Sequence, residues 1–242
     1  MKRIHAFVIS WRGHDDAARG IAEQLAPHVQ GLTIVHSTPQ LSPAGAQGLW
    51  IEMPESAYFG PKFKTCLDHF NGDILLQIQA DATCADWRSL VERCRLRFER
   101  LDRLSVWSPV IQHSPWPLDA VEIRRISPDV ALVAQSDGIV WALGTDAVDR
   151  MKQFDYEDNN LGWGLDWAAI SHAYSKGRWA VCDLTVLVRH PQSTGYDTRE
   201  AMRQMELFLQ QLAPAEAEQY RQLRSYVQLK SRLSRVLGSR SG

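Results

Sequence analysis

The sequence is poor in cysteine, has no excess of charge of either sign and contains no long apolar run. Its four cysteines are scattered over 242 residues without a Cys-x-x-Cys pair, which favours free thiols in a reducing compartment over disulfides or metal ligation. Because 27 basic residues are balanced by 28 acidic ones, the basic excess of a nucleic-acid-binding protein is missing. The apolar run at residues 6–9 is too short for a signal peptide or a membrane span. These absences predict a cytoplasmic protein with no nucleic-acid partner.

Internal repeats and low-complexity tracts are absent too, and the remaining pattern is that of an α/β protein. Residues 4–10 read as a strand, residues 15–28 carry apolar residues at helical spacing, and residues 32–35 read as a second strand. A strand, a helix and a strand within about 35 residues form a βαβ unit, which predicts a parallel sheet. The length suits one α/β domain, alone or with an appended helical tail.

The rest of the chain alternates between predicted strands and helices. Strands are expected at residues 50–53, 73–78, 121–126, 130–134 and 139–143, and helices at 62–70, 86–100, 145–151, 199–212 and 214–237. The sequence Ser136-Asp137-Gly138 is typical of a hairpin turn. It predicts that the strands on either side of it pair with each other.

Polar residues follow three of the predicted strands, at the edge where open parallel sheets bind ligands. They are Ser10, Trp11 and Arg12 after the first strand, His36 after the second, and Gln79 and Asp81 after the strand at 73–78. Arg12 or Lys62 could neutralise a phosphate. Trp11 could either stack on a base or pack in the core.

Asp81 has two interpretations. It could cap the turn after a buried strand, or it could hold a divalent cation that bridges a diphosphate. Mn²⁺ and Mg²⁺ favour carboxylate oxygens and share their sites with substrate phosphates. Because a single carboxylate is a weak site, a second ligand is needed, and His190 is the candidate since imidazole suits Mn²⁺ better than Mg²⁺. A histidine at a strand end is otherwise structural or exposed.

Residues 159–196 combine a turn, an acid, a helix, a strand and a histidine in that order. The turn contains Trp163 and Gly164, and the acid is Asp166. Asp166 could cap the helix, where a carboxylate suits the helix dipole. It could also act as a general base, because burial in an aromatic-walled cleft would raise its pKa towards neutrality. Trp163 could stack on a sugar ring or pack in the core.

In their order, these segments resemble a nucleotide-sugar glycosyltransferase of the GT-A fold, close to the family 2 type. The resemblance covers about residues 4–197 and rests on AFVISWRG, YFGPKFKTCLDHFNGDILLQIQAD, SDGIVWALGTDAVDRM, GWGLD and RHP. It implies a mostly parallel sheet flanked by helices, with a domain over residues 1–197 and a helical extension over 198–242. It also implies an Mn²⁺ or Mg²⁺ ion at Asp81 and His190, and Asp166 as the base of an inverting transfer.

Two positions depart from the pattern of that family. Where the family has its Asp-x-Asp motif, the chain reads Gln79-Ala80-Asp81, so only the later carboxylate is present. Where the family has an acidic cluster after the second strand, the chain reads His36-Ser37-Thr38.

We therefore expect transfer of a sugar from a nucleotide-diphospho-sugar donor to a saccharide or lipid-linked acceptor. A nucleotidyltransferase of the same fold and a non-catalytic nucleotide- or sugar-binding module are the alternatives. From residue 219 onward the chain has six basic residues and no acidic ones, with apolar residues at helical spacing. This tail is either a solvated helix packed by its apolar stripe, or a basic helix in peripheral contact with the inner face of the membrane.

Overall fold

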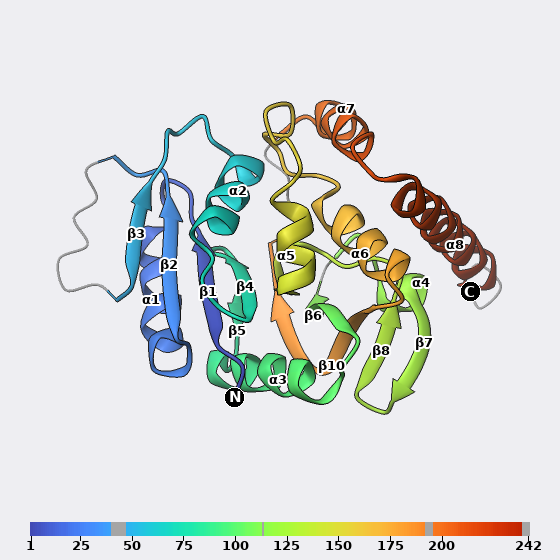
Figure 1. Cartoon of the computed structure of the whole chain (residues 1–242), viewed down its shortest axis with the longest axis horizontal. Helices are drawn as coiled ribbons and strands as arrows, with labels where there is room; N and C mark the ends of the chain where they lie inside the picture. Colours follow the sequence, from blue (N-terminus) through green and yellow to red (C-terminus); the bar gives the residue numbers. More distant parts are fainter. Residues whose placement is uncertain (40–46, 113, 192–195, 239–242) are drawn as a thin grey trace.

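The structure is a computed structural model that describes residues 1–39, 47–112, 114–191 and 196–238. Its centre is one sheet in the order β3-β2-β1-β4-β9-β6-β10-β8-β7, and β5 pairs with β10 off this path. The strands are β1 (Ile4–Ile9), β2 (Gly31–His36), β3 (Leu49–Glu52), β4 (Ile74–Gln79), β5 (Thr83–Cys84), β6 (Leu104–Gln112), β7 (Glu122–Ser127), β8 (Val130–Val133), β9 (Val140–Gly144) and β10 (Trp179–Arg189). Strands β1 to β4, β6 and β10 run in one direction (Figure 1). Strand β9 runs antiparallel to its neighbours β4 and β6. The predicted α/β class with a mostly parallel sheet is confirmed.

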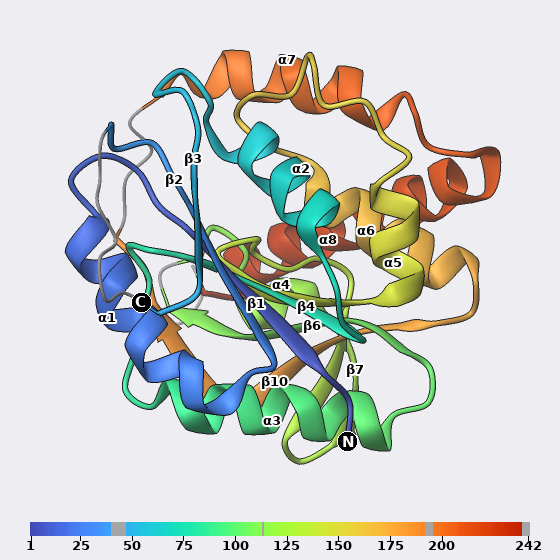
Figure 2. The same cartoon turned by 60° about the vertical axis from the view of Figure 1, so that its left-hand side comes forward.

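Helices cover both faces of the sheet (Figure 2). They are α1 (Asp15–Leu25), α2 (Phe59–His69), α3 (Trp87–Arg100), α4 (Leu118–Val121), α5 (Thr145–Met151), α6 (Leu165–Ser175), α7 (Thr198–Leu209) and α8 (Pro214–Gly238), with a short 3-10 helix η1 at Ala26–His28. Helices α1 and α3 pack on one face, and α2, α5, α6 and α8 pack on the other. Each face therefore has its own apolar core.

The apolar spacing of the sequence explains why the helices lie where they do. On α1, Ala18, Ile21 and Leu25 fall on one side and are at most 5 % exposed. Burial of a side chain such as Ile or Leu stabilises a fold by about 1.5–3 kcal/mol. Helix α3 begins after Asp86, whose Oδ1 accepts the backbone N–H of Ser89 at 3.0 Å. This N-cap fixes the start of a helix that the sequence predicts from the same residue.

The predicted hairpin between the strands at 130–134 and 139–143 is wrong. Strand β8 pairs with β7 and β10, whereas β9 lies between β4 and β6. All five residues of β9 are buried, because helices cover this strand on both faces. Burial on both faces stabilises a fully apolar strand more in the centre of the sheet than in the edge hairpin that the turn residues favour. The connection from Ala134 to Ile139 consequently crosses to the carboxyl edge of the sheet.

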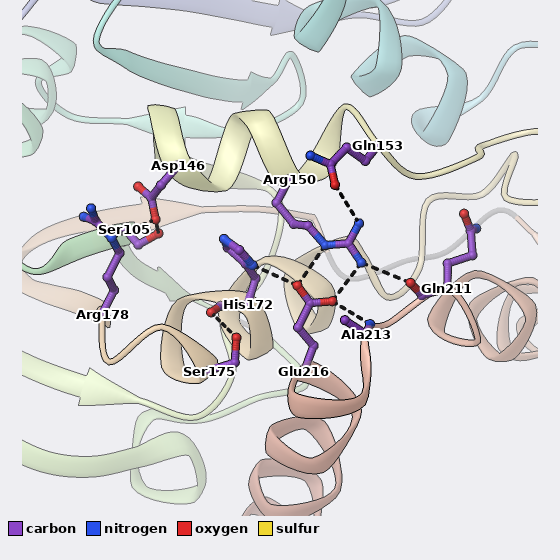
Figure 3. A network of polar contacts seen from close by, with 10 residues as sticks. All are labelled: Ser105, Asp146, Arg150, Gln153, His172, Ser175, Arg178, Gln211, Ala213 and Glu216. Atoms are coloured by element: carbon purple, nitrogen blue, oxygen red, sulfur yellow. Dashed lines mark hydrogen bonds and ion pairs between the residues drawn. The ribbon is translucent and has the colours of Figure 1, made fainter.

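A buried ionic network holds the start of α8 against α5 and α6 (Figure 3). Glu216 accepts hydrogen bonds from Arg150 Nε and Nη2, both at 2.8 Å. It also bonds His172 Nδ1 and the backbone N–H of Ala213, each at 2.8 Å. Burial alone would raise the pKa of Glu216, but these partners hold it well below its ordinary value. All four lone-pair directions of the carboxylate are thus occupied.

Farther along α8, apolar side chains continue the contact with the body of the protein. Leu223 and Val227 are 7 % and 2 % exposed, and α8 packs on α4 and α6. No helix in the described part of the chain is both long and apolar enough to cross a membrane. The division into residues 1–197 and 198–242 stays a prediction.

Candidate active site

The carboxyl edge of β1 carries a buried ammonium group. Lys62, on α2, is fully buried, and its Nζ donates a hydrogen bond to the backbone carbonyl of Ser10 at 2.6 Å. The same Nζ lies 5.0 Å from the centre of the Trp11 ring, which is within the range of a cation–π contact. Burial lowers the pKa of Lys62 to about 8, although the charge of Asp15 acts in the opposite direction. Three of the predicted substrate residues, Ser10, Trp11 and Lys62, therefore lie together.

Arg12 and His36, also predicted to bind substrate, differ in their surroundings. Arg12 is exposed, and its guanidinium lies 3.7 Å from the Glu55 carboxylate. His36 ends β2, is 2 % exposed and stands edge-on to Trp50, with ring centres 5.6 Å apart. Burial is the main cause that lowers the pKa of His36, and the nearby charge of Lys62 adds to it. His36 thus belongs with the buried group around Lys62, whereas Arg12 faces the surface.

Asp81 and His190 meet across the sheet. The Nε2 atom of His190 lies 3.2 Å from Asp81 Oδ2. The antiparallel pairing of the short β5 with the end of β10 explains this meeting, because it brings the residue after β10 back to the turn after β4. Gln79, the last residue of β4, donates its backbone N–H to the carbonyl of Ile139 at 2.9 Å. The structure therefore brings together the two residues that the sequence predicts as metal ligands.

The donor atoms at this point fit a divalent cation. Burial alone would lower the pKa of His190, but its hydrogen bond with Asp81 and the charges of Asp81 and Asp137 outweigh burial and raise it. The second oxygen of Asp81, Oδ1, is buried and has no hydrogen-bond partner among the described residues. Such an orphaned oxygen beside an imidazole suits Mn²⁺ or Mg²⁺. Within the described residues no three His, Cys, Asp or Glu side chains cluster as metal ligands, so two is the number this edge supplies.

The turn before α6 depends on two glycines. Gly162 and Gly164 have φ values of +76° and +88°, in the left-handed region that other residues avoid. The side chain of Asn159 braces the turn, since its Oδ1 accepts the N–H of Gly162 and its Nδ2 donates to the carbonyl of Trp163, both at 3.0 Å. A Cβ at Gly164 would also lie 2.8 Å from Met205. Glycine at these two positions therefore allows the turn that begins α6 to lie close to α7.

Asp166 is in the first turn of α6 and has only neutral partners. Its Oδ1 accepts the backbone N–H of Trp167 at 2.8 Å, and its Oδ2 accepts a hydrogen bond from Gln135. The pKa of Asp166 is raised to about 7, mainly by burial and in part by the charge of Asp137, while the hydrogen bond from Trp167 acts in the opposite direction. A carboxylate that titrates near neutral pH is suited to accept a proton from a hydroxyl.

An aromatic wall connects the Lys62 group with the turn before α6. Trp163 Nε1 donates a hydrogen bond to the hydroxyl of Tyr196 at 2.8 Å. The rings of Tyr196 and Tyr58 meet edge-on with centres 5.4 Å apart, and Tyr58 lies 5.6 Å from Trp11. Burial raises the pKa of both tyrosines. The negative charge of Asp81 adds to this rise at Tyr58, and the negative charge of Asp137 adds to it at Tyr196. The wall therefore runs beside the acidic groups from Asp81 to Asp137.

Sequence reasoning missed four residues of this site. Gln135 and Asp137 belong to the connection between β8 and β9, which the predicted hairpin assigned to a turn. The available signal in the sequence was the presence of an amide and a carboxylate side chain in a loop next to the end of a predicted strand. Tyr58 and Tyr196 are 138 positions apart, and no local pattern in the sequence indicates that they meet.

No protein-family model matches the sequence, and no curated protein matches it either. Similar solved structures do exist. A mannosyltransferase from Pyrobaculum calidifontis in complex with GDP-Man and Mn²⁺ has a TM-score of 0.59 at 12 % identity, over 100 % of this chain and 76 % of that one. Glucosyl-3-phosphoglycerate synthase from Mycobacterium tuberculosis, with Mn²⁺, UDP and glucosyl-3-phosphoglycerate, has a TM-score of 0.55 at 9 % identity, over 86 % and 77 %.

A synthetase complexed with a nucleotide is also similar in fold. CMP:2-keto-3-deoxy-manno-octonic acid synthetase complexed with CTP has a TM-score of 0.51 at 14 % identity, over 87 % of this chain and 100 % of that one. At these identities the likeness concerns the fold. The chain therefore has the GT-A fold of nucleotide-sugar glycosyltransferases, as its motifs predicted.

Proposed function

We propose that this protein transfers a sugar from a nucleotide-diphospho-sugar to an acceptor hydroxyl, with inversion at the anomeric carbon. The observation that carries the proposal is Asp166. It is a partly buried carboxylate without a cationic partner, its pKa is raised to about 7, and it lies on the same edge of a GT-A sheet as the Asp81–His190 pair. A partly buried acid without a counter-charge costs folding free energy when it is ionised, and such a cost is typical of catalytic groups.

In this proposal Asp166 is the general base. Its carboxylate takes the proton of the acceptor hydroxyl while the hydroxyl oxygen forms a bond to the anomeric carbon. The bond from the anomeric carbon to the diphosphate oxygen breaks on the opposite face, and the nucleoside diphosphate leaves. Gln135 and the N–H of Trp167 hold the carboxylate in place throughout. Trp163 and Gly164 border the acceptor, whose hydroxyl must reach Asp166.

The donor side is assigned to the other end of the aromatic wall. Asp81 and His190 would hold Mn²⁺ or Mg²⁺, which supplies Lewis-acid stabilisation of the departing diphosphate when bound. Lys62 adds a buried positive charge beside Ser10 and Trp11. Arg12 would have to leave Glu55 to reach a phosphate, and it is the weakest of the predicted contacts.

The acceptor in this proposal is a saccharide or a lipid-linked glycan. Helix α8 offers a surface for the second kind. Leu229 and Leu233 are 59 % and 49 % exposed, and Lys230 and Arg232 lie between them in the sequence. Exposed apolar side chains interleaved with basic ones are typical of helices that lie on anionic membranes.

A thermal-shift panel of nucleotide-sugars with and without Mn²⁺, followed by donor hydrolysis, tests the proposed function. We expect Mn²⁺-dependent stabilisation by one class of donor, and release of its sugar. Asp81→Asn and His190→Ala should lose the Mn²⁺ dependence, whereas the exposed Asp102→Asn at the opposite edge should keep it. If Mn²⁺ and every donor leave the melting temperature of the folded protein unchanged, the proposal is wrong.

Two other outcomes of the same panel identify a different function. Pyrophosphate release from a nucleoside triphosphate and a free sugar would establish a nucleotidyltransferase, the candidate that the likeness to the CMP-sugar synthetase favours. Binding of nucleoside diphosphates without turnover of any donor or triphosphate would establish a non-catalytic binding module.

A further inference from the structure

Two aromatic rings flank the indole that follows Asp166. Trp167 is the next residue of α6, and its backbone N–H donates to Asp166 Oδ1 at 2.8 Å. The ring of Trp116, just before α4, meets Trp167 edge-on with centres 6.2 Å apart, and the ring of Tyr220, on α8, does so at 5.4 Å. Trp167 is only 5 % exposed, whereas Trp116 and Tyr220 are partly exposed. The two outer rings therefore keep apolar surface that the fold does not bury.

Both outer rings lie close to the acids of the site. The backbone N–H of Trp116 donates to Ser114 Oγ at 3.0 Å, and a hydrogen bond from the Ser114 side chain acts on the Asp137 carboxylate. Besides burial, the charge of Asp137 raises the pKa of Asp166, and the charge of Asp166 in turn adds to the rise that burial causes in the pKa of Tyr220. Helix α8 packs on α4 and α6 (Figure 1). A molecule that presents a hydroxyl to Asp166 would therefore meet Trp116 and Tyr220 as well.

Two neutral polar atoms in the loop that holds the base have no hydrogen-bond partner among the described residues. They are Gln135 Oε1 and Ser136 Oγ, in residues that are 2 % and 6 % exposed. The Gln135 amide turns its Nε2 to the Asp166 carboxylate, so its Oε1 points elsewhere and requires an O–H or N–H donor. Leaving a buried acceptor unpaired is costly, and a hydroxyl of a ligand would remove that cost.

This combination favours a neutral sugar ring. The C–H face of a sugar packs on aromatic rings, while its hydroxyls both donate and accept hydrogen bonds. The carboxylates of Asp137 and Asp166 would repel a phosphorylated or carboxylated acceptor. A bare alkyl chain would leave Gln135 Oε1 unpaired. Arg224, whose Nη1 donates to the Tyr220 hydroxyl at 3.3 Å, is the cation that an anionic acceptor would have to use instead.

We propose that Trp116 and Tyr220 form a subsite for the acceptor, and that they bind the terminal ring of a neutral saccharide beside Asp166. The inference rests on the proposed function, because it describes the acceptor end of the same site. It makes α8 part of the substrate-binding surface rather than an appended helix. A free glycan and a lipid-linked glycan both present such a ring.

Transfer measurements on the full chain, with Mn²⁺ and the donor that stabilises it, test this assignment. The acceptor probes are the methyl and octyl glycosides of glucose, galactose, mannose and N-acetylglucosamine, together with 3-phosphoglycerate as an anionic acceptor. We expect transfer to at least one neutral glycoside and none to 3-phosphoglycerate. A lower KM for the octyl form than for the methyl form would identify a lipid-linked glycan as the source of the ring, and equal values would identify a free one.

Two variants remove an aromatic face without adding a charge. Trp116→Leu and Tyr220→Leu should each raise the KM of the accepted glycoside by roughly 5- to 10-fold, because each removes one ring contact with the sugar. Donor hydrolysis, in which water replaces the acceptor, should stay within about twofold, since Asp166 and the donor end are unchanged. Tyr220→Phe keeps the ring and should keep the KM of the natural protein.

The matched control is Tyr226→Leu on the same helix. The hydroxyl of Tyr226 donates to the carbonyl of Glu122 at 2.6 Å, so this side chain faces β7. Its removal should change neither the KM of the glycoside nor the rate of donor hydrolysis. A merely structural role for Trp116 and Tyr220 would instead lower hydrolysis together with transfer, because loosened packing around Trp167 would displace Asp166.

Three results would overturn this inference while the proposed function stands. They are transfer to 3-phosphoglycerate, donor hydrolysis without transfer to any glycoside, and leucine variants whose KM is unchanged or whose hydrolysis falls in parallel with transfer. If the folded natural protein neither binds nor turns over any donor, the proposed function fails and this inference fails with it.

Discussion

Asp166, which is partly buried, and Glu216, which is buried, are acids in the first turn of a helix, and they differ in what faces them. Glu216 has Arg150, His172 and a backbone N–H around it, so its pKa lies well below its ordinary value (Figure 3). Asp166 has an amide and a backbone N–H, and burial raises its pKa to about 7. The difference teaches that partners, rather than burial, decide whether a buried acid stabilises the fold or remains reactive.

The two acids are also connected through the structure. Helix α6 carries both Asp166 and His172, so the Glu216 network fixes the helix on which the base stands. On the same side, the rings of Trp167 and Tyr220 meet edge-on with centres 5.4 Å apart, which places α8 against the first turn of α6. Glu216 is therefore a structural residue that positions a reactive one.

The largest expected effect is on turnover, through Asp166. Asp166→Asn keeps the shape of the side chain but cannot accept a proton at neutral pH. Because a general base contributes about 10²–10⁴-fold, sugar transfer should fall by roughly 10³-fold while donor affinity stays within about twofold. Calorimetry with the donor and single-turnover transfer measure the two quantities separately. Unchanged turnover would remove Asp166 from the mechanism.

Breaking the Glu216 network should destabilise the fold. Glu216→Gln leaves Arg150 and His172 without their charged partner, and disrupting a buried ion pair in this way costs about 3 kcal/mol. Denaturant unfolding measures the loss. The matched control is Glu218→Gln two residues later, whose partner Arg221 is exposed, and it should leave the unfolding midpoint unchanged. If the two variants unfold at the same denaturant concentration, the network does not stabilise the contact of α8 with α5 and α6.

Replacing Asp166 should have the opposite effect on stability. The folded pKa of Asp166, about 7, is above its ordinary value of 3.8, so ionisation costs folding free energy as the pH rises from about 4 to about 7. Asp166→Asn removes this cost. The variant should be more stable than the natural protein by about 2 kcal/mol at pH 8, an amount discounted for partial exposure, and by much less at pH 4. A variant that is less stable at pH 8 would show that the carboxylate is well solvated.

The smallest expected effect concerns Asp137. Its negative charge raises the pKa of Asp166, so Asp137→Asn should lower that pKa. Because the base must be ionised to act, the acidic limb of the pH–rate profile should move to lower pH. The exposed Glu157→Gln serves as the control and should leave the limb in place. A shift to higher pH in Asp137→Asn would contradict the sign of this interaction.

The sequence predicted the local parts of this molecule well. Helix α1 follows from the spacing of Ala18, Ile21 and Leu25, and α3 starts directly after Asp86, where its predicted range begins. The meeting of Asp81 and His190 was also expected, because both residues follow strands that end at one edge of a sheet. In each of these cases the deciding interactions are short in sequence or follow from parallel strand order.

The failures come from contacts between distant segments. Turn residues at positions 136–138 favour a hairpin, but the apolar strand β9 gains more between β4 and β6, so Gln135 and Asp137 reach the site instead. The pairing of Tyr58 with Tyr196 has no local signal either. The same holds for the bond between Arg150 and Glu216, 66 positions apart. Such contacts depend on how the finished layers pack.

A carbon-13 NMR titration of the side-chain carboxyl groups tests the contrast between the two acids most directly. In one sample of the folded protein, the signal of Asp166 should titrate with a midpoint near pH 7. The signal of Glu216 should not move above about pH 4, since its partners keep it ionised. If Asp166 instead titrates near pH 4 together with the surface carboxylates, it lacks the near-neutral pKa that the proposed general base requires.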